Sequence, residues 1–167
     1  MTRPLVVLIA LSMLFTACSK EPAPPVKNPA SPVGNPSTSA DPEARVKEVI
    51  MRYNQLLAYG YQNLNMNPLQ EVASVRQAEK AYHHMAALGE GGVRMLSHLK
   101  QIDFEKMDLS DRKAVVRTRE VWDFSYSDIR TEKRKDDVKD FLYLMEYTLV
   151  DDNGRWLIQE TAVIPGR

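Results

Sequence analysis

The sequence has one cysteine, Cys18, among its 167 residues. A single cysteine excludes an internal disulfide and a zinc site built from paired cysteines. Lysines plus arginines number 22, and aspartates plus glutamates also number 22, so no excess of charge attracts nucleic acid. The longest apolar run, from Leu5 to Phe15, is too short to cross a membrane, which takes about 20 residues.

That apolar run follows a positive charge at Arg3 and is followed by the small residues Thr16 and Ala17. These three features together are typical of a secretory signal peptide, predicted here over residues 1–17. The stretch LFTAC, which ends at Cys18, resembles the lipobox of bacterial lipoproteins, in which the cysteine becomes the acylated first residue of the mature chain. An uncleaved membrane anchor and an ordinary secreted protein are the alternatives.

The resemblance implies that Cys18 is a lipid anchor and that the protein belongs to the cell envelope. Ser19 after the cysteine points, by analogy with lipoprotein sorting, to the outer membrane and its periplasmic side. Residues 18–42 hold seven of the ten prolines and favour an extended, disordered tether. Residues 43–167 are expected to form the single domain.

The first half of this domain has helical periodicity. Asp41 and Pro42 are expected at the N-cap and first position of a helix whose apolar residues run from Val46 to Leu57. A second helix is predicted to begin with a capping box at Asn67 and to stop at Gly89. The residues expected on its apolar, buried face are Val72, Val75, Ala78, Tyr82 and Met85. Residues 93–99 are predicted to form one more short helix.

The period then changes to two, which indicates β-strands. Alternate residues from Val116 to Tyr126 share one face, and residues 141–149 form a further strand. Asn153-Gly154 predicts a two-residue hairpin turn. In that register Leu149 faces Ile158 and Tyr147 faces Glu160. Helices followed by about four antiparallel strands predict an α+β fold with the helices on one face of the sheet.

The segment YLMEYTLVDDNGRWLIQETAV is similar to the C-terminal hairpin of the nuclear-transport-factor-2-like superfamily, most of all to the IMS-type domain of plastid-division proteins and their bacterial relatives. The matching residues are Tyr143, Tyr147, Gly154, Trp156 and Ile158. The resemblance implies a cone-shaped half-barrel with a pocket on its concave face, and homodimers are common in this fold. No position matches a catalytic motif of the superfamily.

Glu120 and Glu160 are the candidates for chemistry, since each stands among aromatic residues in an apolar alternation. A desolvated carboxyl there could act as an acid or base beside Tyr147, it could be satisfied by a tyrosine hydroxyl or an arginine, or it could lie at the open rim of the sheet. The expected pocket residues are Tyr53, Trp122, Phe124, Tyr143, Tyr147, Trp156 and Glu160.

His83 and His84 are neighbours and would point about 100° apart on a helix, so they are expected at the surface or rim, and neither a metal nor a cofactor is predicted. The second face of the sheet also carries apolar residues, such as Leu142 and Leu144, which favours a homodimer or an envelope partner. The sequence therefore predicts a binding module for a partner protein or small apolar ligand. The alternative is a small lyase or isomerase.

Overall fold

The computed structural model describes residues 41–165 of the chain. The predicted signal peptide, Cys18 with its predicted acylation, and nearly all of the predicted tether lie outside the described residues. Pro42, the last residue of that predicted tether, is the first residue of the first helix, and Asp41 is its N-cap. Within the described residues, no helix has both the length and the apolar character needed to cross a membrane.

Helix α1 runs from Pro42 to Asn63, and its predicted start is confirmed. The Asp41 side chain accepts a hydrogen bond from the Glu43 amide at 3.1 Å, which satisfies one of the free N–H groups of the first turn. Gly60 lies within the last turns of this helix and does not end it. A Cβ atom at this position would clash with Sδ of the buried Met66, so a larger residue would force that side chain to shift.

The second helix was predicted in the wrong place. Asn67–Glu71 form only a short 3-10 helix, η1, and α2 runs from Val75 to Glu90 with the Ser74 hydroxyl accepting from the Gln77 amide. The later start changes the buried face. Ala78 and Met85 are buried as expected, together with Gln77 and Ala81, but Val75 and Tyr82 are exposed.

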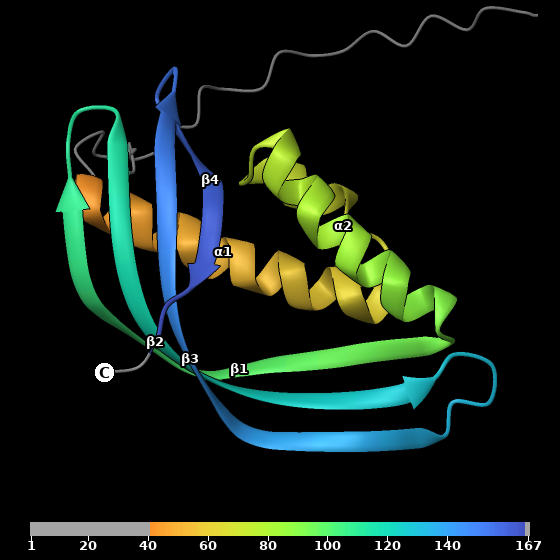
Figure 1. The fold of residues 1–167 in the computed structure, drawn as a ribbon. Helices are drawn as coiled ribbons and strands as arrows, with labels where there is room; N and C mark the ends of the chain where they lie inside the picture. The colour runs from red at the N-terminus through yellow and green to blue at the C-terminus, as the bar shows by residue number, and fades with distance from the viewer. Residues whose placement is uncertain (1–40, 166–167) are drawn as a thin grey trace, which may run out of the picture. The chain divides into compact units, whose positions relative to one another are not determined.

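Residues 93–99 are not a helix, because they begin the long strand β1, Val93–Leu109. It pairs with β2, Lys113–Asp128, from Val93 opposite Asp128 to Leu109 opposite Ala114. Strands β3, Arg134–Asp152, and β4, Arg155–Val163, complete an antiparallel meander in the order β1-β2-β3-β4. Both helices lie on one side of this sheet (Figure 1), so the predicted α+β fold is confirmed.

Three long strands of the sheet bend sharply toward the helices (Figure 1). The pairing register is interrupted at neighbouring places, after Leu99 in β1, after Trp122 in β2 and before Phe141 in β3. Such bulges bend a strand and increase its twist. On the outer side, Asp123 accepts from the Asp140 amide at 3.0 Å and from Lys139 at 3.0 Å. The aligned bulges make the inner surface of the sheet concave.

The Asn153-Gly154 turn forms as predicted, with φ angles of 55° and 86°. The register is also correct from Asp152–Arg155 to Leu149–Ile158. It then shifts, because Gln159 is an extra residue in β4, and Thr148 pairs with Glu160. Tyr147 therefore faces Thr161, and the predicted pairing of Tyr147 with Glu160 is wrong. A shift of one residue exchanges the two faces of a strand.

Candidate functional site

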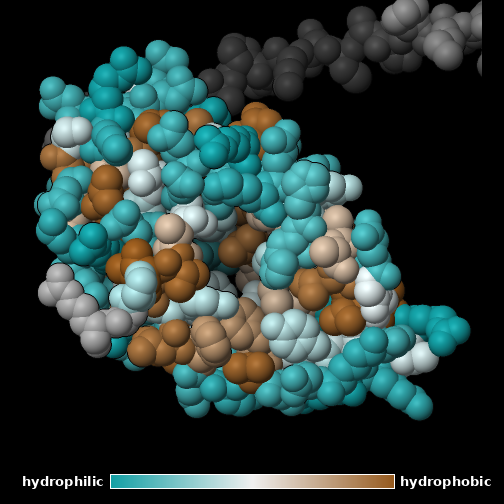
Figure 2. Space-filling view, in the orientation of Figure 1, coloured by the Kyte–Doolittle hydropathy of each residue, from teal (hydrophilic) through white to brown (hydrophobic). Residues whose placement is uncertain are grey.

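A cavity of about 500 Å³ lies between the concave face of the sheet and the two helices. Its walls come from α1, from His84 of α2, and from all four strands. Figure 2 shows a hollow in this face of the molecule, with apolar side chains around it. A volume of this size is within the range of small-molecule sites, roughly 300–1,000 Å³.

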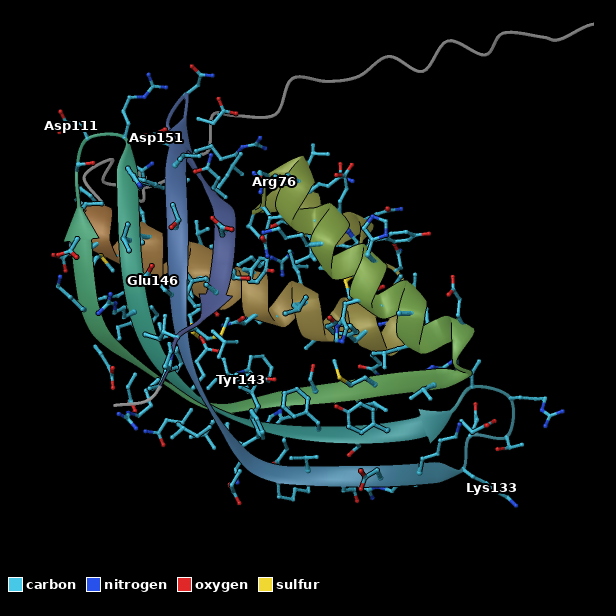
Figure 3. The ribbon with its side chains drawn as sticks, in the orientation of Figure 1. Arg76, Asp111, Lys133, Tyr143, Glu146 and Asp151 are labelled. Carbon is cyan, nitrogen blue, oxygen red and sulfur yellow. The ribbon has the colours of Figure 1, made fainter. Side chains whose placement is uncertain are left out.

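Aromatic rings from the bent part of the sheet form one wall of the cavity. Trp122 and Phe124 are stacked with ring centroids 6.0 Å apart, and Phe124 meets Tyr143 edge to face at 6.2 Å. Phe141 lies 4.6 Å from Tyr143, centroid to centroid. Tyr143 projects from β3 into the space between sheet and helices (Figure 3). The bulges thus gather these rings at the bend.

Glu120 lies in the wall of the cavity and is only 2% exposed. Its Oε1 accepts hydrogen bonds from the Thr118 hydroxyl at 2.8 Å and the Tyr147 hydroxyl at 2.7 Å. Its Oε2 accepts one from the indole Nε1 of Trp122, also at 2.8 Å. Three neighbouring side chains therefore donate hydrogen bonds to this one carboxylate. Short bonds of this kind are expected when the acceptor carries charge.

Tyr147 connects this carboxylate to helix α1. Its hydroxyl donates to Glu120 and accepts from the amide nitrogen of Asn54 at 3.1 Å. Burial, and then the negative charge of Glu120, raise the pKa of Tyr147 well above its ordinary value. The phenol therefore keeps its proton at neutral pH and holds it toward Glu120.

Of the four further tyrosines that line the cavity, three have a pKa that burial raises. Together with Tyr147 they are called here the cavity tyrosines: Tyr53, Tyr61, Tyr143 and Tyr147. Tyr53 accepts a hydrogen bond from Gln77 at 2.8 Å, and the same amide donates to Thr161 at 3.0 Å. Tyr61 contacts Nδ1 of His84 at 2.5 Å. His84 is exposed and lies at the rim, where histidines of this segment were expected.

Five of the seven expected pocket residues line the cavity, and two do not. Glu160 lies outside, where its carboxylate accepts from Lys80 of α2 at 3.2 Å and is more than half exposed. The extra residue at Gln159 turns Glu160 away and brings Thr161 into the wall. Trp156 packs in the core beyond the cavity and is 5% exposed.

Sequence reasoning did not select Asn54, Thr118 or Thr161 as site residues. Asn54 carried a usable signal, because it is a polar residue beside Tyr53 and Leu57 on the apolar side of a helix. Thr118 shares its face with Glu120 in the predicted alternation and is fully buried. Thr161 could not have been found without knowledge of the bulge. Among residues 41–165 there is no group of three side chains that could hold a metal ion.

The opposite face of the sheet is not covered by helices within the described residues (Figure 1). Leu142 is 48% exposed there. Nearby, Arg117 pairs with Glu146 at 2.9 Å and Arg119 pairs with Glu105 at 2.8 Å. The face therefore alternates exposed apolar groups with ion pairs across strands, as a sheet that faces water on one side often does.

No family model matches the sequence, and no curated protein sequence matches it. Among solved structures, the intermembrane space region of the chloroplast protein ARC6 is similar, with 16% identity and a TM-score of 0.62 over 72% of this chain and 95% of that one. A nuclear transport factor 2-like protein from Salmonella enterica serovar Typhimurium matches 73% of this chain and 89% of its own, at 12% identity and a TM-score of 0.49. The domain therefore shares the α+β fold of the ARC6 intermembrane space region, the kind of domain that its hairpin sequence had indicated.

Proposed function

We propose that this protein is a lipid-anchored component of the cell envelope whose domain binds a small ligand with a largely apolar body and does not transform it. One observation carries the proposal. The domain holds an open, aromatic cavity of about 500 Å³, and the buried carboxylate in its wall is already occupied by three internal donors.

The lining suits an apolar body. The walls include Leu57, Met95, Met145 and Val163 in addition to the aromatic rings. Burial of apolar surface contributes roughly 25 cal/mol per Å², so a ligand that fills such a space binds without any specific ion pair. The concave sheet holds this space open, because strand bulges rather than flexible loops shape it.

The hydrogen bonds of Glu120 support a binding protein better than they support a lyase or isomerase. A general base needs a lone pair within reach of the substrate proton. Oε1 of Glu120 already accepts two hydroxyl protons and Oε2 accepts the indole proton. Glu160, the other predicted acid or base, lies outside the cavity beside Lys80. The hydrogen bonds of Glu120 are therefore typical of contacts that stabilise a fold rather than of a catalytic acid or base.

The envelope location rests on the sequence. The apolar run from Leu5, the small residues Thr16 and Ala17, and Cys18 directly behind them support an acylated N-terminus facing the periplasm, with the outer membrane favoured by Ser19. Residues up to Asp41 would then tether the binding domain to the membrane surface.

The test is a fluorescence titration with Nile red, a neutral probe that brightens in apolar surroundings. The wild-type protein should bind the probe saturably. Ser97→Phe should weaken binding, because Ser97 lines the cavity and a phenyl ring there would take up part of its space. Ser110→Phe, in the turn after β1, is the matched control and should bind as the wild type does. Absence of saturable binding, or equal binding by both variants, would refute the proposal.

A further inference from the structure

The buried carboxylate of Glu120 has no cationic partner. Its three hydrogen-bond donors are a hydroxyl, a phenol and an indole, all neutral. Among the ion pairs of the described residues, none includes Glu120. The cavity wall contains neither lysine nor arginine. The carboxylate of Glu120 is thus held by neutral hydrogen-bond donors alone and forms no ion pair with the described residues.

Neutral donors disperse a carboxylate's charge without cancelling it. Inside a protein the effective dielectric constant is far below that of water, so the field of such a charge extends several ångströms into the adjoining space. Low-dielectric walls also concentrate the field within a concave site. A cation in the cavity would therefore gain energy from Glu120, whereas an anion would be repelled.

The aromatic wall favours the same kind of ligand. The faces of aromatic rings carry partial negative charge and attract cations that approach within about 6 Å of the ring centroid. The ring of Tyr143 stands at 85° to that of Phe124, and Phe141 is tilted by 57° to Tyr143. Phe124, Phe141 and Tyr143 all line the cavity, so a ligand there lies against a wall of several aromatic rings.

Trp122 connects the carboxylate of Glu120 with the aromatic wall of the cavity. Its Nε1–H donates to Oε2 of Glu120, so the carboxylate lies at the edge of the indole ring. A negative charge at that edge pushes electron density into the ring and makes its faces more attractive to a cation. The indole also stacks on Phe124, which continues the aromatic wall toward Tyr143. Charge and rings therefore act on the same part of the cavity.

We infer that the cavity selects a small organic cation, an ammonium or quaternary ammonium group carried on an apolar body, over neutral and anionic molecules of the same shape. This inference rests on the proposed function, because it names the class of ligand for that same cavity. Glu120 supplies the long-range attraction, the rings of Trp122 and Tyr143 contact the cationic head, and the aliphatic residues contact the apolar body.

The test is displacement of Nile red by three probes of matched shape: phenyltrimethylammonium, its neutral isostere tert-butylbenzene, and benzenesulfonate. The cation should displace the dye at a concentration about tenfold or more below that of the neutral probe, as expected for a desolvated cation over aromatic rings. The anion should be the weakest. Equal or better displacement by the neutral probe would overturn the inference while leaving the proposed function intact. Failure of Nile red itself to bind would instead refute the proposed function.

Glu120→Gln separates charge from shape in the same assay. The cation should lose about tenfold in affinity, and the neutral probe should bind as before. Glu160→Gln removes a carboxylate outside the cavity and should leave both unchanged. An unchanged cation preference in Glu120→Gln would overturn the inference. Should this variant not fold, Tyr143→Leu at a partly exposed position tests the aromatic contribution, and it must weaken the cation more than the neutral probe.

Discussion

Tyr147→Phe removes a single hydroxyl from the centre of the polar network without changing the volume of the ring. That hydroxyl donates to Glu120 at 2.7 Å and accepts from Asn54 at 3.1 Å, and the side chain is 1% exposed. A hydrogen bond to a charged group contributes roughly 1.5–3 kcal/mol. We therefore expect the free energy of unfolding to fall by about 2 kcal/mol, since the ring still packs against its apolar neighbours.

Urea denaturation followed by tryptophan fluorescence measures this loss. With a urea dependence of about 1–3 kcal/mol per molar, the midpoint should fall by roughly 0.7–2 M. Tyr143→Phe is the matched control, because the Tyr143 hydroxyl makes no hydrogen bond to the described part of the chain, and its midpoint should hardly move. A loss below about 0.5 kcal/mol for Tyr147→Phe would show that the phenol does not stabilise a charged Glu120 and would refute the reasoning.

Three further predictions follow from the same structure. Gly60→Ala should lower the free energy of unfolding by about 1–3 kcal/mol, because its Cβ would meet Met66. Gly89→Ala, which has open space around it in α2, should instead raise the free energy of unfolding by about 0.5–1 kcal/mol. Equal effects of the two substitutions in urea denaturation would contradict this prediction. The cavity tyrosines have raised pKa values, so the unfolded chain releases these protons first as the pH rises through about 10. Stability should therefore be independent of these groups below pH 10 and should fall above it, with phenolate absorbance of the folded protein appearing later than in urea; an early phenolate signal would disprove the burial of these groups. Cys18→Ser should move the protein from the membrane fraction to the soluble fraction of its own cells, and retention in the membrane would contradict the lipid anchor.

The local signals at the ends of helices and turns predicted the fold well. Asp41 and Pro42 mark the start of α1, and Asn153-Gly154 forms the turn between β3 and β4, because both depend on neighbouring residues alone. The alternation along β2 likewise placed Glu120 and Trp122 on the face that lines the cavity.

The errors came from residues whose structure depends on distant partners. The segment from Val93 to Leu99 is rich in residues that form helices readily, but pairing with β2 along its whole length outweighs this weak preference. The bulge at Gln159 has no signal in the hairpin sequence, and it lies beside Ile158, whose backbone also bonds to Val72 and Ser74. Without these contacts Glu160 could not be assigned to the outer side.

The central claim is that the native protein carries a small ligand in this cavity. Native mass spectrometry of the full-length protein, extracted from its own envelope in mild detergent, tests it most directly and also gives the oligomeric state. The account predicts an acylated chain with an additional small mass, and loss of that mass in Ser97→Phe. A protein without any small adduct, or an added mass that persists unchanged in Ser97→Phe, would contradict it.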